Sequence, residues 1–457
     1  MNFPSTLLRR LALPLAVAAT VLAAAPSPAG AADPTPTTLT LTAPASGKAG
    51  LPAPFTAKLV DNVGEPIAGA TITLRRTSGT PVTAGTGTTG AKGSVVINAA
   101  VPAGTTTWQA TYAGDTVHAA DVSPVMTVVG RRFATTVQLT APQRVVDERS
   151  VNLNVLWRAS DGSPVGGIVT IHRKLGSGAW SVLRRVRTAN NGRATIAVAP
   201  RVDSQWRAIG TTAAWWLADA SPVVSVDNVP PIAPASYPRA APRPVATKAQ
   251  ARAKGAGANA VITAIPAATW RSMTGRTWHA GCPVGRSGLK LLRINYWGFD
   301  GYRYRGEMVL ATAVARRAAR ALTDMYAGRY PIRRMYRVDR FGWSQKLHGA
   351  NDYASMRADN TSAFNCRSVV NKPSVLSPHA RGRAVDINTW ENPYRSATGL
   401  VPNSWWASRS HPRYAWRSGS HPVVKIWRSH GFRWTYGNVD SQHVDGRGQP
   451  LTGSFLG

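Results

Sequence analysis

Side chains that could hold a metal ion stand in two short segments near the end of the chain. The first, residues 377–388, reads Ser-Pro-His-Ala-Arg-Gly-Arg-Ala-Val-Asp-Ile-Asn. At its end apolar residues alternate with Asp386, which is typical of a strand whose carboxylate faces away from the core side chains. His379 lies seven residues earlier and would fall on the opposite face of a straight strand. A turn at Gly382 would remove that conflict and let one imidazole and one carboxylate converge on a divalent metal.

The second segment is polar, lies between Gly437 and Gly446, and contains Asp440 and His443. Residues three apart share a side in a turn, so His443 is the third candidate ligand and Asp440 lies beside it. Three protein ligands and a water are the layout of a catalytic zinc site, whereas structural sites usually close with a fourth ligand. Zinc lowers the pKa of its bound water to about 7 and polarises a scissile carbonyl, while a nearby carboxylate moves the proton to the leaving amine.

Each of these residues has an ordinary structural role as its alternative. A single histidine is more often a surface or hydrogen-bonded structural residue, and an aspartate in a glycine-rich loop usually forms a turn. Their combination is more specific. The pattern Ser377-x-His379-x-x-Gly382-x-Ala384-x-Asp386, followed by Asp440-x-x-His443, resembles the VanY-type family of zinc D-alanyl-D-alanine carboxypeptidases and L-alanyl-D-glutamate endopeptidases. Segments 281–284, 297–301, 331–334 and 360–367 also fit that family's endopeptidase-like branch, so the likeness covers nearly all of residues 265–457.

The resemblance implies a role for each matching position. His379, Asp386 and His443 would bind one zinc ion, and Asp440 would be the general base. Endopeptidase members of the family commonly have Asp at the base position, so Asp440 favours that activity. In related enzymes an arginine upstream of the first ligand holds the substrate or the developing oxyanion. Arg367 is the candidate here, with a plain surface role as its alternative.

The chain departs from the family directly after the last metal ligand. Val444 and Asp445 stand where the family usually has His or Trp and an aromatic residue. The departure leaves the ligands intact but puts the substrate preference in doubt. It also makes Asp445 a rival of Asp440 for the role of base.

Helices and strands must position these residues in a domain that we expect over residues 260–457. Apolar residues recur at helical spacing from 314 to 326, which predicts an amphipathic helix over residues 307–327. Residues 332–338 are expected to follow as a strand. A second helix is predicted to begin at His421-Pro422 and to end at Gly431. The mixture of helical and strand signals indicates the α+β class.

The region before this domain contains an internal repeat with a period of about 98 residues, in which Trp206 corresponds to Trp108. Short β-branched runs separated by turn residues are typical of antiparallel sandwiches. We therefore expect two all-β sandwiches, residues 34–130 and 132–228, that resemble bacterial immunoglobulin-like modules. Both tryptophans are predicted to be core residues. Residues 229–259, rich in Pro, Ala and basic residues, are expected to be a semi-extended linker.

The N-terminus predicts export from the cell. Two arginines precede an apolar run and small residues, so residues 1–31 are interpreted as a cleavable signal peptide. No later stretch is apolar for long enough to span a bilayer. In an oxidising compartment the two cysteines, Cys282 and Cys366, are expected to form a disulfide, with two free thiols as the alternative.

The composition agrees with a folded protein, because hydrophobic residues make up 44% and charged residues only 16% of the sequence. The net charge of +33 favours anionic partners such as cell-wall polymers, although a general preference for arginine would also produce it. Nucleic acid is not expected as a partner of an exported protein. We therefore predict an extracellular, cell-wall-associated zinc metallopeptidase that hydrolyses peptide bonds in peptidoglycan stem peptides. The alternative is a non-catalytic wall-binding surface protein that retains the peptidase fold.

Overall fold

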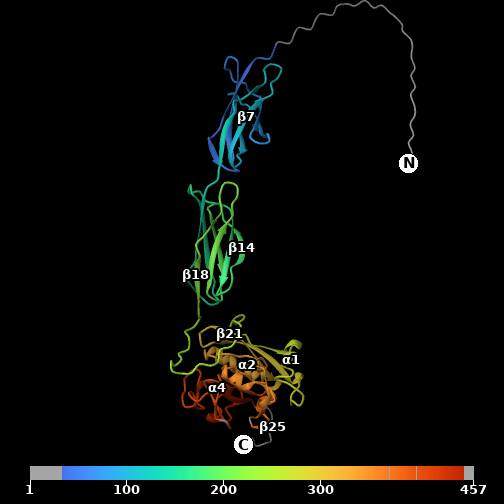
Figure 1. Cartoon of the computed structure of the whole chain (residues 1–457), viewed down its shortest axis with the longest axis vertical. Helices are drawn as coiled ribbons and strands as arrows, with labels where there is room; N and C mark the ends of the chain where they lie inside the picture. Colours follow the sequence, from blue (N-terminus) through green and yellow to red (C-terminus); the bar gives the residue numbers. More distant parts are fainter. Residues whose placement is uncertain (1–32, 370, 398, 447–457) are drawn as a thin grey trace, which may run out of the picture. The chain divides into compact units, whose positions relative to one another are not determined.

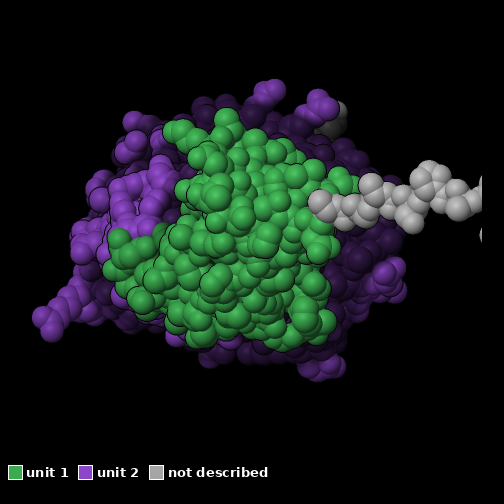
Figure 2. All heavy atoms as spheres, turned by 90° about the horizontal axis from the view of Figure 1, so that it is seen from above, with its two compact units in different colours: residues 1–135, 159–161, 212–218 green, residues 136–158, 162–211, 219–457 purple. Residues whose placement is uncertain are grey.

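The computed structural model describes residues 33–369, 371–397 and 399–446, and Figure 1 shows the chain coloured along its sequence. The predicted signal peptide, residues 1–31, lies outside the described residues. Backbone contacts divide the chain into two compact units, which Figure 2 distinguishes by colour. One unit comprises residues 1–135, 159–161 and 212–218, and the other comprises residues 136–158, 162–211 and 219–457.

The first sandwich consists of two sheets whose strands alternate buried and exposed residues. One sheet has the order β1-β3-β6, and the other has the order β2-β9-β7-β4-β5 with β8 beside β7. Alternation directs every second side chain into a shared core, where the rings of Phe55 and Trp108 lie 4.5 Å apart. The strands are β1 (Thr37–Thr42), β2 (Ser46–Lys48), β3 (Pro52–Asp61), β4 (Thr71–Arg76), β5 (Val82–Thr88), β6 (Ser94–Ala100), β7 (Gly104–Tyr112), β8 (Asp121–Val122) and β9 (Met126–Arg131).

The second sandwich repeats this strand order, which confirms the predicted pair of all-β modules. Its sheets have the orders β10-β12-β15 and β11-β18-β16-β13-β14, with β17 beside β16. Trp206 is 2% exposed, as expected of a core residue. The strands are β10 (Thr135–Thr140), β11 (Arg144–Val146), β12 (Val151–Ala159), β13 (Ile168–Leu175), β14 (Ser181–Arg187), β15 (Arg193–Val198), β16 (Ser204–Gly210), β17 (Asp219–Ala220) and β18 (Val224–Val229).

The segment expected to be a linker, residues 229–259, instead packs along the C-terminal domain. Ala241 and Ala253 are buried, and the side-chain amide of Gln250 donates to the backbone carbonyls of Arg305 and Met335. Small apolar residues and side-chain hydrogen bonds hold the segment without any helical or strand period. Hydrophobic periodicity therefore could not reveal that it belongs to the domain.

The core of the C-terminal domain forms where α2 packs on an antiparallel sheet of order β19-β20-β21. These elements are β19 (Val261–Ala264), β20 (Leu289–Trp297), β21 (Arg303–Ala311) and α2 (Thr312–Ala327), and α1 (Ala267–Met273) precedes them. The predicted helix over residues 307–327 was wrong at its start, because residues 307–311 belong to β21. Both faces of β21 are buried there, since Met308 and Val309 pack into different hydrophobic clusters. A doubly buried strand gives a continuous apolar run, which periodicity does not separate from a helix.

The predicted strand over residues 332–338 is also wrong. This segment makes a single bridge, between Arg334 and Asn360, and a 3-10 turn η2 (Val338–Phe341) follows. Its apolar residues are nevertheless core residues, because Ile332 and Met335 are at most 1% exposed. The second predicted helix is present as α4 (Pro422–Ser429), and the His421 side chain accepts a hydrogen bond from the backbone N–H of Val423 at its start.

The remaining short elements surround the predicted metal ligands. They are β22 (Trp343–Ser344), β23 (Gly349–Ala350), α3 (Asp352–Arg357), β24 (Ser368–Val369), β25 (Lys372–Leu376), β26 (Ala384–Asp386), β27 (Tyr394–Ser396), β28 (Gly399–Val401), β29 (Phe432–Arg433) and β30 (His443–Gly446). The 3-10 turns are η1 (Arg286–Gly288), η3 (Gln345–Leu347), η4 (Pro378–Arg381) and η5 (Gly437–Val439). A disulfide joins Cys282 to Cys366, whose Cα atoms are 5.9 Å apart. Within the described residues, helices long and apolar enough to cross a membrane are absent.

Candidate metal centre

Strand pairing places two of the predicted ligands directly opposite each other. β26 and β30 are antiparallel neighbours, and their register pairs Asp386 with His443. Side chains of paired residues project to the same face of a sheet. The preceding pair in this register, Val385 with Val444, packs into the main hydrophobic cluster on the other face. The alternation that buries the two valines therefore holds the carboxylate and the imidazole side by side.

The third predicted ligand, His379, comes from the 3-10 turn η4 just before β26. Ser377 begins this turn, and its hydroxyl accepts a hydrogen bond from the His379 backbone N–H. Gly382 ends the turn in the left-handed region, with φ of 66°. A Cβ at this position would lie 2.8 Å from the backbone nitrogen of Ala311. Both the backbone angle and the close approach require glycine, and the resulting turn brings His379 to the face that carries Asp386.

The three side chains present donor atoms at the spacing of a metal coordination shell. His379 Nε2 lies 3.1 Å from Asp386 Oδ2 and 3.2 Å from His443 Nδ1, and His443 Nδ1 lies 3.1 Å from Asp386 Oδ1. Tetrahedral bonds of about 2.0–2.1 Å to zinc would separate such atoms by about 3.3 Å. All three residues are buried. Burial works to raise the pKa of Asp386, but the two histidines outweigh it and hold that pKa well below its usual range.

Hydrogen bonds behind the ligands orient both imidazoles. His379 Nδ1 lies 2.7 Å from the carbonyl oxygen of Ala363, so Nδ1 is the donor and the Nε2 lone pair faces the other ligands. His443 Nε2 lies 2.9 Å from Asp445 Oδ1, which turns Nδ1 toward the other ligands. Burial opposes a charge on this ring, but Asp445 and Asp386 outweigh it and raise the pKa of His443. Such outer partners are typical of histidines that bind metals. The donor set therefore fits a divalent cation.

Asp440 lies beside this cluster with an unengaged carboxylate oxygen. Within the described residues its Oδ1 is buried and has no hydrogen-bond partner. Its backbone carbonyl accepts from the His443 N–H, which closes the turn between the two residues. Burial raises the pKa of Asp440 to about 7, since desolvation and the neighbouring Asp386 outweigh the attraction of nearby cationic groups. A buried carboxylate with a free oxygen is suited to accept and release a proton.

Arg367 lies close to the cluster and is largely enclosed, since its side chain is 12% exposed. Its guanidinium makes an ion pair of 2.6 Å with Asp352, at the start of α3. Burial opposes its charge, but Asp352 and Tyr394 outweigh the effect, so the pKa of Arg367 is raised. Sequence reasoning missed Asp352, the Ala363 carbonyl and the contact of Asp445 with His443. The first two lie far along the chain from the residues that they hold, and neither has a distinctive spacing.

A second cluster of metal-binding residue types, His279, Cys282 and Cys366, has a structural explanation. Both sulfur atoms are in the disulfide. His279 Nε2 lies 2.9 Å from the carbonyl oxygen of Cys366 and 3.0 Å from that of His348, so its ring connects the loops around the disulfide. We assign no metal to this cluster, because metal binding needs the thiolate.

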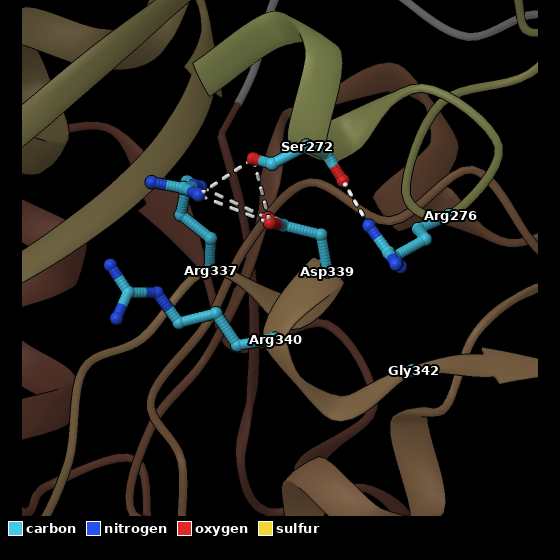
Figure 3. Close-up of a pocket in the computed structure, with 6 residues that line it drawn as sticks. All are labelled: Ser272, Arg276, Arg337, Asp339, Arg340 and Gly342. Carbon is cyan, nitrogen blue, oxygen red and sulfur yellow. Dashed lines mark hydrogen bonds and ion pairs between the residues drawn. The ribbon is translucent and has the colours of Figure 1, made fainter. Parts of the chain in front are cut away.

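A pocket of about 450 Å³ in the same domain is lined by arginines and contains none of the candidate ligands (Figure 3). Arg337 donates to both oxygens of Asp339 and to the hydroxyl of Ser272. Glu307 accepts from Arg337 and Arg340. Carboxylates thus balance much of the positive charge, which indicates a structural ion-pair network. The lining residues are Ser272, Arg276, Arg337, Asp339, Arg340 and Gly342.

Comparison with known proteins gives a family match over the segment that carries the candidate ligands. Residues 370–446 match the family model described as D-alanyl-D-alanine carboxypeptidase. This segment contains His379, Asp386, Asp440 and His443, but not Arg367. No curated protein matches the chain.

The solved structures that the chain resembles include three of low sequence identity. The D0-D1 domain of intimin is 20% identical, with 42% of this chain and 98% of that chain covered and a TM-score of 0.18. Invasin, a bacterial integrin-binding protein, is 16% identical, with 58% and 48% covered and a TM-score of 0.27. Alpha-2-macroglobulin from Salmonella is 13% identical, with 45% and 18% covered and a TM-score of 0.21. TM-scores this low do not establish a shared fold, so the fold assignment rests on the strands described above.

Proposed function

We propose that this chain, whose residues 370–446 match the D-alanyl-D-alanine carboxypeptidase family model, is a secreted zinc peptidase that cleaves peptidoglycan stem peptides. The observation that carries the proposal is the buried set of three donor atoms, 3.1–3.2 Å apart, beside the unengaged oxygen of Asp440. A structural ion pair needs neither two imidazoles oriented by outer hydrogen bonds nor an unsatisfied carboxylate oxygen beside them. Together these features favour hydrolytic chemistry over a purely structural role.

His379, Asp386 and His443 would hold one zinc ion through Nε2, a carboxylate oxygen and Nδ1. When bound, the ion would supply a Lewis acid and an acidified water for amide hydrolysis. The Ala363 carbonyl and Asp445 fix the two rings, so little rearrangement is needed for binding. Because Asp445 contacts the ring nitrogen that faces away from the other ligands, it is better suited to orient His443 than to act as the base.

Asp440 would carry the proton during hydrolysis. Its carboxylate accepts a proton from the attacking water as the water oxygen bonds to the scissile carbonyl carbon. The carboxylic acid then donates that proton to the amine as the carbon–nitrogen bond breaks. A pKa raised by burial suits both steps, because the group must gain and lose a proton near neutral pH. The products are a new carboxylate and a free amine, so no reactant other than water is consumed.

Arg367 would stabilise negative charge on the substrate, either on the carbonyl oxygen or on a carboxylate of the stem peptide. The guanidinium is largely enclosed, the pKa of Arg367 is raised, and its Nε is buried without a partner within the described residues. Asp352 holds one edge of the guanidinium and therefore fixes its direction. D-Alanine termini and D-glutamate both carry free carboxylates, which a fixed arginine is suited to bind.

Extracellular action agrees with several features of the chain. The signal-like N-terminus, the disulfide and the net charge of +33 all suit an exported protein that acts on an anionic wall. The same features would also suit a wall-binding protein without activity. Retention of Asp440 favours the enzyme, because a binding protein needs no buried, unpaired carboxylate at a metal site.

Peptide hydrolysis by the full chain tests the proposal. The zinc-loaded protein is incubated with purified stem peptides of defined length, with and without a chelator, and the products are identified by mass spectrometry. We expect cleavage that the chelator abolishes and that added zinc restores. The masses of the products distinguish removal of a terminal D-alanine from cleavage between L-alanine and D-glutamate. Chelator-resistant cleavage would exclude the metal mechanism, and no cleavage of any stem peptide would favour the binding protein.

A further inference from the structure

The second sandwich carries a basic surface that the proposed peptidase activity does not use. Lys174 lies on β13, Arg185 and Arg187 lie on β14, and Arg207 lies on β16. We call these four residues the basic face. β13 pairs with β14 on one side and with β16 on the other, so the face spans three adjacent strands.

The strand register shows that all four side chains project to the same side of the sheet. Thr170 pairs with Arg185, and Ile168 pairs with Arg187. On the other side of β13, Lys174 pairs with Gln205, and His172, two residues earlier, pairs with Arg207. The intervening residues Val169 and Ile171 are in the core, so their neighbours in sequence face outward.

No carboxylate balances these charges within the described residues. The sequences of β13, β14 and β16 contain neither Asp nor Glu. Arg187 donates to the carbonyl of Gly166, and Arg207 lies over the ring of Trp180 at 4.7 Å. Asp227, on β18, is in register with Arg144 at the far edge of the sheet. Cations on adjacent strands repel one another, so these four charges do not stabilise the folded sandwich.

The first sandwich provides an internal comparison, because it repeats the same pairing with neutral residues. Its strands β4 and β5 pair Thr73 with Thr86 and Thr71 with Thr88, where the second sandwich has Arg185 and Arg187. Both sandwiches have a register shift at the same place in this strand pair. The module therefore folds without the two arginines, and their presence is specific to the second copy.

The same comparison holds on the other side of the central strand. Gln109 pairs with Arg75 on β4, and Arg207 occupies the corresponding position on β16, opposite His172. The first sandwich thus has one cation, Arg75, on the equivalent surface. Three positions change from Thr, Thr and Gln to arginine between copies of one fold, so the fold itself does not require these charges.

We propose that the basic face binds a linear phosphodiester polymer of polyol units, the chemistry of anionic wall polymers. Guanidinium groups bind phosphate oxygens in a bidentate manner. Arg185 and Arg187 are two residues apart on an exposed edge strand, so their Cα atoms are separated by about 6.7 Å, and neighbouring strands add rows about 4.8 Å away. Single-stranded nucleic acid fits less well, because its binding usually requires several exposed aromatic rings and Trp180 is already covered by Arg207.

A variant that copies the first sandwich tests this proposal in the full chain. Arg185→Thr, Arg187→Thr and Arg207→Gln are combined, and binding to poly(glycerol phosphate) is measured over a range of salt concentrations. The control combines Arg144→Gln, Arg149→Gln and Arg193→Gln, exposed arginines of the same sandwich outside the basic face. The control removes the same number of positive charges, three, as the basic-face variant. Circular dichroism and thermal melting check that both variants fold.

We expect the basic-face variant to bind at least about tenfold more weakly and the slope of log affinity against log salt to fall by about 2. The control should lose less than about threefold. Equal losses in both variants would show that net charge alone attracts the polymer, and unchanged binding in both would show that neither set contributes, so either result overturns the proposal. Tighter binding of single-stranded DNA, or equal binding of polyglutamate, would overturn the phosphodiester assignment. None of these outcomes depends on peptidase activity.

Discussion

Removal of the Asp445 carboxylate tests whether this residue orients His443 for metal binding. In Asp445→Ala the hydrogen bond of 2.9 Å to His443 Nε2 is lost, while all three donor atoms remain. The ring is then free to rotate, and its neutral form can place the proton on Nδ1, the atom that faces Asp386. Loss of such an outer partner typically weakens metal binding by about 10- to 100-fold, which corresponds to about 1.4–2.8 kcal/mol.

Metal affinity is measured by competition with a chromogenic chelator, which reports binding without any need for turnover. Asp445→Asn should lie between wild type and Asp445→Ala, because its carbonyl oxygen still accepts the hydrogen bond but carries no charge. Asp324→Ala is the matched control, since Asp324 makes a similar carboxylate pair with His430 away from the ligands. We expect the control to bind metal as tightly as wild type. An Asp445→Ala protein with wild-type affinity would refute the orienting role.

Three further changes test other parts of the structure. Gly382→Ala forces a Cβ into a left-handed position against the backbone of β21, and we expect a loss of at least about 1 kcal/mol in unfolding free energy, with weaker metal binding. Glu391→Gln should remove a pH dependence: burial and the neighbouring Asp359 raise the pKa of Glu391, so wild-type stability falls as pH rises above the unfolded value of about 4.5. Urea denaturation from pH 5 to 8 should show an unfolding free energy that declines with pH for the wild type and changes less for the variant. Equal pH dependence in both proteins would contradict the role of Glu391. Replacing Cys282 and Cys366 by Ser opens a crosslink across 84 residues, and chemical denaturation should show a loss of about 4–5 kcal/mol.

The sequence predicted the site best where the type of a residue indicated both its backbone conformation and its chemical role. Asp386 between two apolar residues indicated a strand face, and Gly382 indicated the turn that the structure places there. The convergence of His443 on the same point depends on the pairing of β26 with β30. Two-residue periodicity locates a strand but does not choose its partner, so the family resemblance was the most specific link between the two segments.

The errors arose where the sequence carried no periodic signal that distinguishes one element from another. Residues 307–311 continued the apolar pattern of α2 because both faces of β21 are covered, and the segment 229–259 packs without any period at all. The partners behind the ligands could not be predicted for a different reason. A backbone carbonyl such as that of Ala363 carries no side-chain signature, and Asp352 becomes relevant only when tertiary structure brings it to Arg367.

Asp440 separates a peptidase from a protein that only retains the metal site, so Asp440→Asn tests the central claim most directly. The two proteins are compared for zinc content by elemental analysis and for the rate of stem-peptide cleavage in the same preparation. We expect one zinc ion per chain in both, because Asp440 is not a ligand, and a cleavage rate at least about 100-fold lower in the variant, as loss of proton transfer typically causes. Wild-type turnover in the zinc-loaded variant would contradict the account.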